Sequence, residues 1–172
     1  SCQKHGYQSI MLTSSLENEG KSSIAANLAL ALAANDHKVL IIDCDLRKPS
    51  LHKIFHLNTQ RNINEYLNGK GTWEKQVQYL NKNDLFVLCA IQDIENAENL
   101  LSGERIKQLI NNAKKEFDFV IIDTSPIVGI NDALIVAEIV DASLLVIKQN
   151  EATDYLINDM INRLVSTKNN LI

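Results

Sequence analysis

The sequence predicts an α/β fold of three layers, in which helices cover both faces of a mainly parallel sheet. Three observations predict it. Short, almost wholly apolar runs alternate with segments of helical period, a Gly-Lys-Ser opens the first of these helices, and two apolar runs end in aspartate. Such runs are typical of parallel strands buried on both faces, and these sheets bind ligands beyond the carboxyl ends of their strands.

The expected elements follow one another in βαβ order. Apolar runs predict strands at 9–14, 38–43, 85–90, 119–125 and 143–148, and helical periodicity predicts helices at 21–34, 103–116 and 132–139. Thr153 is a favourable N-cap for a last helix that runs to about 167. The closing Leu171-Ile172 predicts the start of one more strand, truncated by the end of the sequence.

The segment 60–84 interrupts this order. It is more polar and holds turn signals at Asn68-Gly69 and Gly71, so it is predicted to be a helical crossover insertion. No internal repeat or low-complexity tract appears, and 172 residues suffice for one domain with a sizeable core. A single domain is therefore expected over residues 1–172.

The composition argues against several classes of protein. A net charge of −4 and a pI near 5.5 do not suit a nucleic-acid surface, where clustered Lys and Arg would dominate. Three cysteines without a Cys-x-x-Cys pair fit a reducing compartment. No apolar run approaches the roughly 20 residues that cross a bilayer. The chain is therefore expected to be cytoplasmic.

A phosphate-binding loop is predicted between the first strand and the first helix. The pattern G-x-x-x-x-G-K-[ST] needs amides free to surround phosphate, a lysine that reaches phosphate oxygens and a hydroxyl for Mg²⁺. Ser15 replaces its first glycine, but the following helix N-terminus favours phosphate, and Asn18 tolerates positive φ. The predicted nucleotide-binding residues are Ser15, Glu17, Asn18, Glu19, Gly20, Lys21, Ser22 and Ser23.

Two of the predicted strands lead into acidic residues. "VLIIDCD" ends in Asp43 and Asp45, and "FVIID" ends in Asp123. A parallel sheet gathers these ends at one edge, where carboxylates repel one another unless a cation lies nearby. The loop hydroxyl of Ser22 and Asp123 are therefore predicted to hold Mg²⁺, close to the Asp43 and Asp45 pair. Thr124 stands where many ATPases have a water-activating glutamate, so Asp43 and Asp45 are the candidates for a general base.

With these motifs the chain resembles the bacterial tyrosine kinases, or BY-kinases, of capsule and exopolysaccharide export, which are P-loop ATPases related to ParA and MinD. "TSSLENEGKSSIAANLALALA" resembles their Walker A segment, "VLIIDCDLRKPSLHKIF" their Walker A′ and "FDFVIIDTSPIVGINDALIVAEIVDASLLVIK" their Walker B. The Asp-x-Asp-x-Arg followed by Lys-Pro-Ser-Leu-His is the most specific part. The resemblance covers nearly all 172 residues.

The resemblance implies a three-layer P-loop NTPase fold and an autokinase that transfers the γ-phosphoryl group of Mg·ATP to tyrosine hydroxyls. It assigns catalysis to Lys21, Asp43 and Asp45, and it adds Asp43 to Ser22 and Asp123 as a ligand of Mg²⁺. The implied partners are protein tyrosine substrates, other copies in a homo-oligomeric ring, and a transmembrane polysaccharide co-polymerase activator, either a separate chain or an N-terminal part. No nucleic acid is implied. Through its activator the domain would lie at the inner face of the membrane and regulate polysaccharide synthesis and export.

Two other functions stay open at this point. Glu17 and Asn18, where the family usually has Pro-Gly, favour a nucleotide-binding regulatory partner without catalysis. A ParA/MinD-type ATPase would share the fold. Those proteins carry a second lysine early in the loop, however, and Leu16 occupies that position here.

Overall fold

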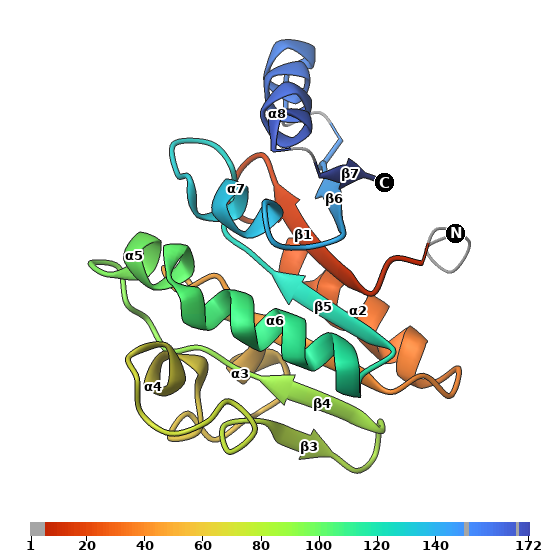
Figure 1. The fold of residues 1–172 in the computed structure, drawn as a ribbon. Helices are drawn as coiled ribbons and strands as arrows, with labels where there is room; N and C mark the ends of the chain where they lie inside the picture. The colour runs from red at the N-terminus through yellow and green to blue at the C-terminus, as the bar shows by residue number, and fades with distance from the viewer. Residues whose placement is uncertain (1–5, 150–151, 168) are drawn as a thin grey trace.

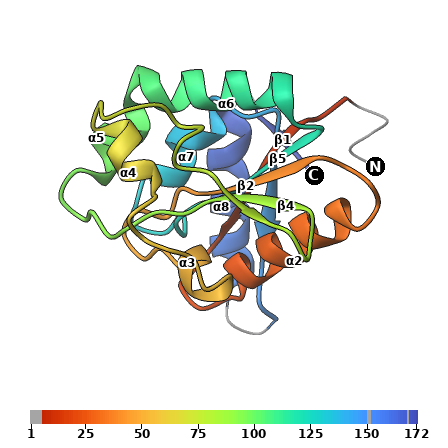
Figure 2. The same cartoon turned by 90° about the horizontal axis from the view of Figure 1, so that it is seen from below.

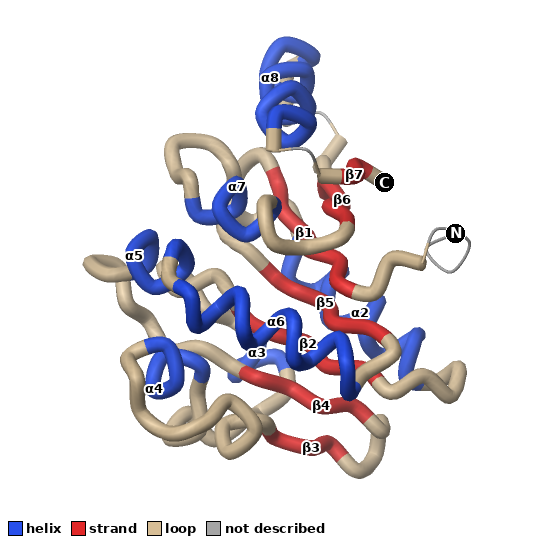
Figure 3. Tube along the Cα trace, viewed as in Figure 1, coloured by secondary structure: helices blue, strands red, loops and turns tan. Residues whose placement is uncertain are grey.

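The computed structural model describes residues 6–149, 152–167 and 169–172. Within these residues, seven strands form one sheet in the order β3-β4-β2-β5-β1-β6-β7 (Figure 3). Their bounds are β1 Ser9–Ser14, β2 Val39–Asp43, β3 Gln78–Leu80, β4 Leu85–Leu88, β5 Phe119–Asp123, β6 Ala142–Val146 and β7 Asn170–Leu171. All neighbouring strands are parallel except β3, which is antiparallel to β4.

The central strands are buried along their whole length. Every residue of β1, β2 and β5 is buried, and isoleucine and valine dominate β2 and β5, as suits strands covered on both faces. The register pairs Asp123 with Leu12 on one side and with Asp43 on the other. The carboxyl ends of these three strands therefore lie at the same edge of the sheet.

The helices form the two outer layers (Figure 1). They are α2 Lys21–Ala33, α3 Leu51–Ile54, α4 Ile63–Leu67, α5 Ala97–Ser102, α6 Glu104–Glu116, α7 Asp132–Ala137 and α8 Asp154–Ser166. Figure 2 shows α6 on one face of the sheet and α2 and α3 on the other. No helix of the described part is long and apolar enough to cross a membrane.

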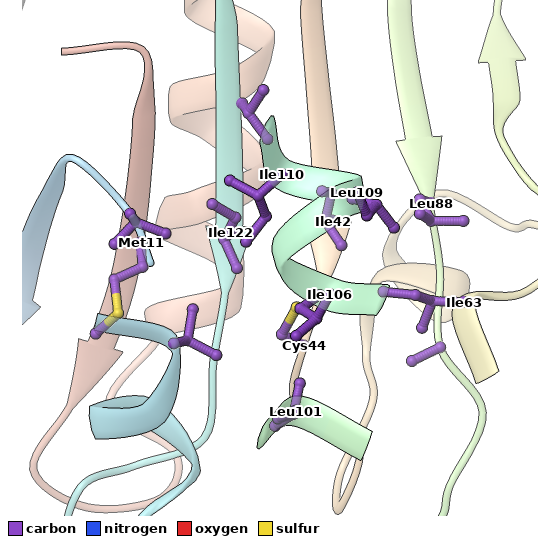
Figure 4. Packing of buried hydrophobic residues seen from close by; sticks show 14 of the residues in the cluster. Met11, Ile42, Cys44, Ile63, Leu88, Leu101, Ile106, Leu109, Ile110 and Ile122 are labelled. Atoms are coloured by element: carbon purple, nitrogen blue, oxygen red, sulfur yellow. The ribbon is translucent and has the colours of Figure 1, made fainter. Parts of the chain in front are cut away.

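Each face of the sheet has its own apolar core. On the first face, side chains of α6 pack toward Ile42 and Ile122 of the sheet (Figure 4). These α6 residues are Ile106, Leu109, Ile110 and Ala113. On the opposite face, α2 packs through three alanines, Ala25, Ala29 and Ala33. The small alanine side chains let α2 lie close to the sheet.

The predicted strands and long helices are confirmed, with ends that differ by one or two residues. The expected last strand is present as β7, which contains Leu171 but not Ile172. The helical crossover predicted for 60–84 is only partly right. It contains α4, but Gln78–Leu80 form the edge strand β3. Three half-polar residues are too few to show strand periodicity.

Candidate nucleotide-binding site

The loop between β1 and α2 presents backbone amides to one side. Asn18 has a φ of 61° and Gly20 a φ of 81°, so both are left-handed on either side of Glu19. No side chain caps α2, and the first amides of a helix have no partner within it. Such an arrangement of amides binds anions such as phosphate. The expectation that Asn18 would accept a positive φ is confirmed.

The carboxylate of Glu19 holds this loop in shape. It accepts hydrogen bonds from the Ser15 hydroxyl at 2.6 Å, the Leu16 amide at 2.9 Å and the Lys148 amide at 3.2 Å. Burial alone would raise the pKa of Glu19, but these hydrogen bonds outweigh it and the pKa is lowered. The side chains of Ser15 and Glu19 therefore bond to the loop itself and to the end of β6.

The Lys21 ammonium lies among acidic groups. Its Nζ is 2.6 Å from Asp123 Oδ1, 3.8 Å from Asp45 Oδ2 and 3.2 Å from Ser22 Oγ. Asp123 is fully buried, and Lys21 and Asp45 are each only 6% exposed. The loop lysine and two of the three predicted aspartates thus meet directly.

Asp43 lies deeper, beside Asp123 in the sheet. Its Oδ2 accepts the amides of Ser50 and Leu51, each at 3.0 Å, and its Oδ1 accepts the Asp45 amide at 3.1 Å. Burial and the charge of Asp123 raise the pKa of Asp43 to about 8, although the amide hydrogen bonds act to lower it. Asp43 therefore orders the start of α3 as well as standing beside the Lys21 cluster.

A cavity of about 410 Å³ opens over this cluster. Its size suits a small-molecule ligand. Among the predicted site residues, those that line it are Glu17, Asn18, Glu19, Gly20, Lys21, Ser22, Ser23 and Asp45. Ser15, Asp43 and Asp123 lie behind the lining, each with 0% of its surface exposed.

The cavity also has lining residues that were not predicted to belong to the site, although Leu16, Arg47, Lys48 and Ser50 lie within the sequence motifs. They are Ser14, Leu16, Arg47, Lys48, Ser50, Lys53, Ile54, Ser125, Pro126 and Ile130. The Ser125 hydroxyl and the Lys48 amide both donate to Asp45 Oδ1, at 2.9 and 3.0 Å. Most of these residues follow shortly after the aspartates at the ends of β2 and β5. That position in the sequence could have predicted that they line the site.

The acidic cluster suits a magnesium ion bound together with phosphates. Asp123 Oδ2 is buried and has no hydrogen-bond partner. In the described residues, no three His, Cys, Asp or Glu side chains form a metal site by themselves. Mg²⁺ is usually held by one or two carboxylates, waters and substrate phosphates, so an all-protein cage is not required. Asp123 and Ser22, both close to Lys21, fit that form of binding.

Comparison with known proteins agrees with this geometry. The sequence matches the AAA domain family over residues 11–171. It is 40% identical over 144 residues to tyrosine-protein kinase YwqD of Bacillus subtilis, covering 84% of this chain and 61% of YwqD. It is 31% identical over 156 residues to the succinoglycan biosynthesis transport protein ExoP of Rhizobium meliloti, covering 89% of this chain and 20% of ExoP. The chain thus spans about three fifths of YwqD and about a fifth of ExoP.

A solved structure is similar over almost the whole chain. The VpsO kinase domain matches with a TM-score of 0.92 at 30% identity, covering 98% of this chain and 83% of that domain. The resemblance inferred from the Walker motifs is therefore confirmed. The chain belongs to the AAA domain family of P-loop proteins, and within it to the bacterial tyrosine-kinase domains.

Proposed function

We propose that this chain is the catalytic domain of a protein-tyrosine kinase that transfers the γ-phosphoryl group of ATP to tyrosine hydroxyls. One observation carries the proposal: Lys21, where the loop meets α2, contacts Asp123 at the end of β5 and Asp45 just after β2. Phosphoryl transfer depends mainly on positioning and charge stabilisation, and this arrangement provides both. The likeness to YwqD and to the VpsO kinase domain supports tyrosine as the acceptor.

In the proposed complex, the amides from Asn18 to Ser23 hold the phosphates. Lys21 turns from Asp123 to the phosphate oxygens, which bring a higher negative charge to the same place. Ser22, Asp43 and Asp123 hold Mg²⁺, which when bound neutralises charge on the transferred group. The orphaned Oδ2 of Asp123 supports its part in this set.

Asp45 accepts the proton of the incoming tyrosine hydroxyl, with Asp43 as the alternative. Asp45 lines the cavity, and its Oδ1 is fixed by Ser125 and Lys48. Its Oδ2, on the side of Lys21, stays available for a proton. Asp43 has a pKa near 8 that suits a proton acceptor at neutral pH, but Asp45 is nearer to an acceptor in the cavity.

The setting that we propose is polysaccharide synthesis and export. The succinoglycan transport function in the name of ExoP supports it. A membrane-spanning co-polymerase partner would hold the domain at the inner face of the membrane and activate it, and copies of the domain would assemble into a ring. The substrates would be protein tyrosines.

A phosphotyrosine assay tests the proposal. The chain is incubated with ATP, with and without Mg²⁺, and with a synthetic glutamate–tyrosine copolymer as acceptor. We expect slow, Mg²⁺-dependent phosphorylation, because the copolymer reaches the site by diffusion. Holding an acceptor in position can lower the activation barrier by roughly 7–11 kcal/mol, and the copolymer lacks this advantage. Asp45→Asn should lower the rate about 10²-fold.

The Asp45→Asn chain should still fold, because an amide oxygen can accept the bonds from Ser125 and Lys48. Its thermal unfolding transition is the control. Normal calorimetric binding of Mg·ATP without any phosphotyrosine would instead favour the regulatory or ParA/MinD-type function.

A further inference from the structure

Tyr155 differs from the other tyrosines in its exposure. It lies in the first turn of α8, the blue helix at the end of the molecule in Figure 1. Its exposed fraction is 83%, the highest among the exposed large hydrophobic side chains. In the described part of the chain, which includes all four tyrosines of the sequence, its hydroxyl has no hydrogen-bond partner.

The remaining tyrosines are held in place. Tyr66 is 6% exposed, donates its hydroxyl to the Arg105 carbonyl and packs under the Arg105 guanidinium. Tyr79 donates its hydroxyl to Asp84 at 2.8 Å and its ring contacts a neighbouring aromatic ring. Tyr7 packs against the apolar core and has a partner of its own. Tyr155 is therefore the tyrosine that can enter another cavity without unfolding.

The charges around Tyr155 complement those around the cavity. Asp154 precedes it, and Asp159 lies four residues later on the same face of α8; both are exposed and neither has an ion-pair partner in the described residues. The exposed Lys48 and Lys53 line the cavity. Lys48 pairs with Glu17, but ion pairs between exposed side chains contribute little to stability, so Lys48 can exchange this partner for another carboxylate. Lys53 forms no ion pair in the part of the chain that the structure describes.

We propose that Tyr155 of a second copy of this chain is a phosphoryl acceptor for the site, with its acidic neighbours facing Lys48 and Lys53. The proposal rests on the kinase function proposed above. A second copy is required because Tyr155 does not line the cavity of its own chain. The Tyr155 Oη forms a bond to the γ-phosphorus of ATP, the bond from that phosphorus to the β–γ bridging oxygen breaks, ADP leaves, and the hydroxyl proton passes to Asp45.

The experiment mixes two variants. Tyr155→Phe supplies an active site without the acceptor, and Asp45→Asn supplies the acceptor with an impaired site. After incubation with Mg·ATP, mass spectrometry locates phosphotyrosine; any signal at position 155 comes from the acceptor chain. We expect phosphate at Tyr155, at a rate that rises with the concentration of both chains and falls as salt is added. The copolymer, in a separate reaction, reports whether Tyr155→Phe is an active kinase.

Charge reversal tests the contact itself. Lys53→Glu in the kinase chain should slow transfer about three- to tenfold at low acceptor concentration, and Asp159→Lys in the acceptor chain should restore most of it. Because Asp159→Lys lies on the acceptor chain, its restoring effect separates the contact between copies from any effect of Lys53→Glu on the site itself.

Three outcomes would overturn the inference. Phosphorylation of the copolymer but not of Tyr155 would reject the acceptor and keep the kinase function. A rate per chain that is independent of concentration would reject transfer between copies. No phosphotyrosine on either substrate, with Mg·ATP still bound, would reject the kinase function and the inference together.

Discussion

Replacing Lys21 with methionine should destabilise the nucleotide-free protein. Its Nζ lies 2.6 Å from Asp123 Oδ1, where unit charges attract by about 6 kcal/mol at an effective dielectric constant of about 20. Desolvation offsets part of that attraction, and breaking a buried ion pair typically costs about 3–5 kcal/mol because one charge stays buried alone. We expect a loss of about that size at pH 8.

The loss should be smaller at pH 5. Burial already raises the pKa of Asp123, against the effect of Lys21, which lowers it. Without Lys21 that pKa rises further, so the carboxyl group stays protonated in the folded protein to a higher pH. A raised folded-state pKa means that stability is lost as pH rises, so the variant should be weakest at the alkaline end.

Thermal unfolding of the free protein at pH 5 and pH 8 measures both effects. For a chain of this size, about 3–5 kcal/mol corresponds to roughly 6–20 °C in Tm. The matched control is the double variant Lys21→Met with Asp123→Asn, which removes both charges and should recover most of the lost stability. An unchanged Tm for Lys21→Met at pH 8, or a double variant no more stable than the single one, would refute the reasoning.

Three further predictions concern the loop, Asp43 and the edge of the sheet. Asn18→Gly should bind Mg·ADP at least as tightly as wild type by calorimetry. Asn18→Val should lose about 1–2 kcal/mol of folding stability because φ is 61° at this position. Equal stability of the two variants would reject the left-handed loop. Asp43 has a folded pKa of about 8, raised from 3.8, so wild type should lose stability relative to Asp43→Asn as pH rises between these values; a Tm difference that does not vary with pH would contradict this. Asp141 accepts the Lys114 ammonium and the amide of Ser9, and despite burial its pKa is lowered; Asp141→Asn should cost about 1–3 kcal/mol at pH 7 and much less at pH 3, by urea unfolding at both pH values.

The sequence predicted the fold well where the pattern is long and repeated. β1, β2 and β5 are fully buried and end at the edge that carries the loop and the aspartates. Each was recognisable from a short apolar run, which is nearly continuous in β2 and β5 and is limited to Ile10–Leu12 in β1. β3 was missed because its three residues, Gln78–Leu80, are too few to show the alternation of a strand. Its existence depends on a neighbour that local periodicity does not report.

For the candidate site, the sequence predicted which side chains lie together better than it predicted their arrangement. The motifs identified Lys21, Asp43, Asp45 and Asp123, but not that Asp43 would hold the amides at the start of α3 while Asp45 faces the cavity. Glu19 was expected to bind the nucleotide, yet its carboxylate bonds to the loop and to the end of β6. Both arrangements depend on where distant backbone amides point, and that is decided by tertiary structure.

The charge balance of the cluster argues for a role other than folding. One ammonium, Lys21, stands among three largely buried carboxylates, Asp43, Asp45 and Asp123. The raised pKa values of Asp43 and Asp123 show that the folded protein disfavours their charged forms. Well-packed apolar residues in place of a buried ionic group often give equal or greater stability. Repulsion among the three carboxylates, with Asp123 Oδ2 left without a hydrogen-bond partner, therefore destabilises the ligand-free protein. An additional cation shared with a phosphate ligand would relieve this repulsion.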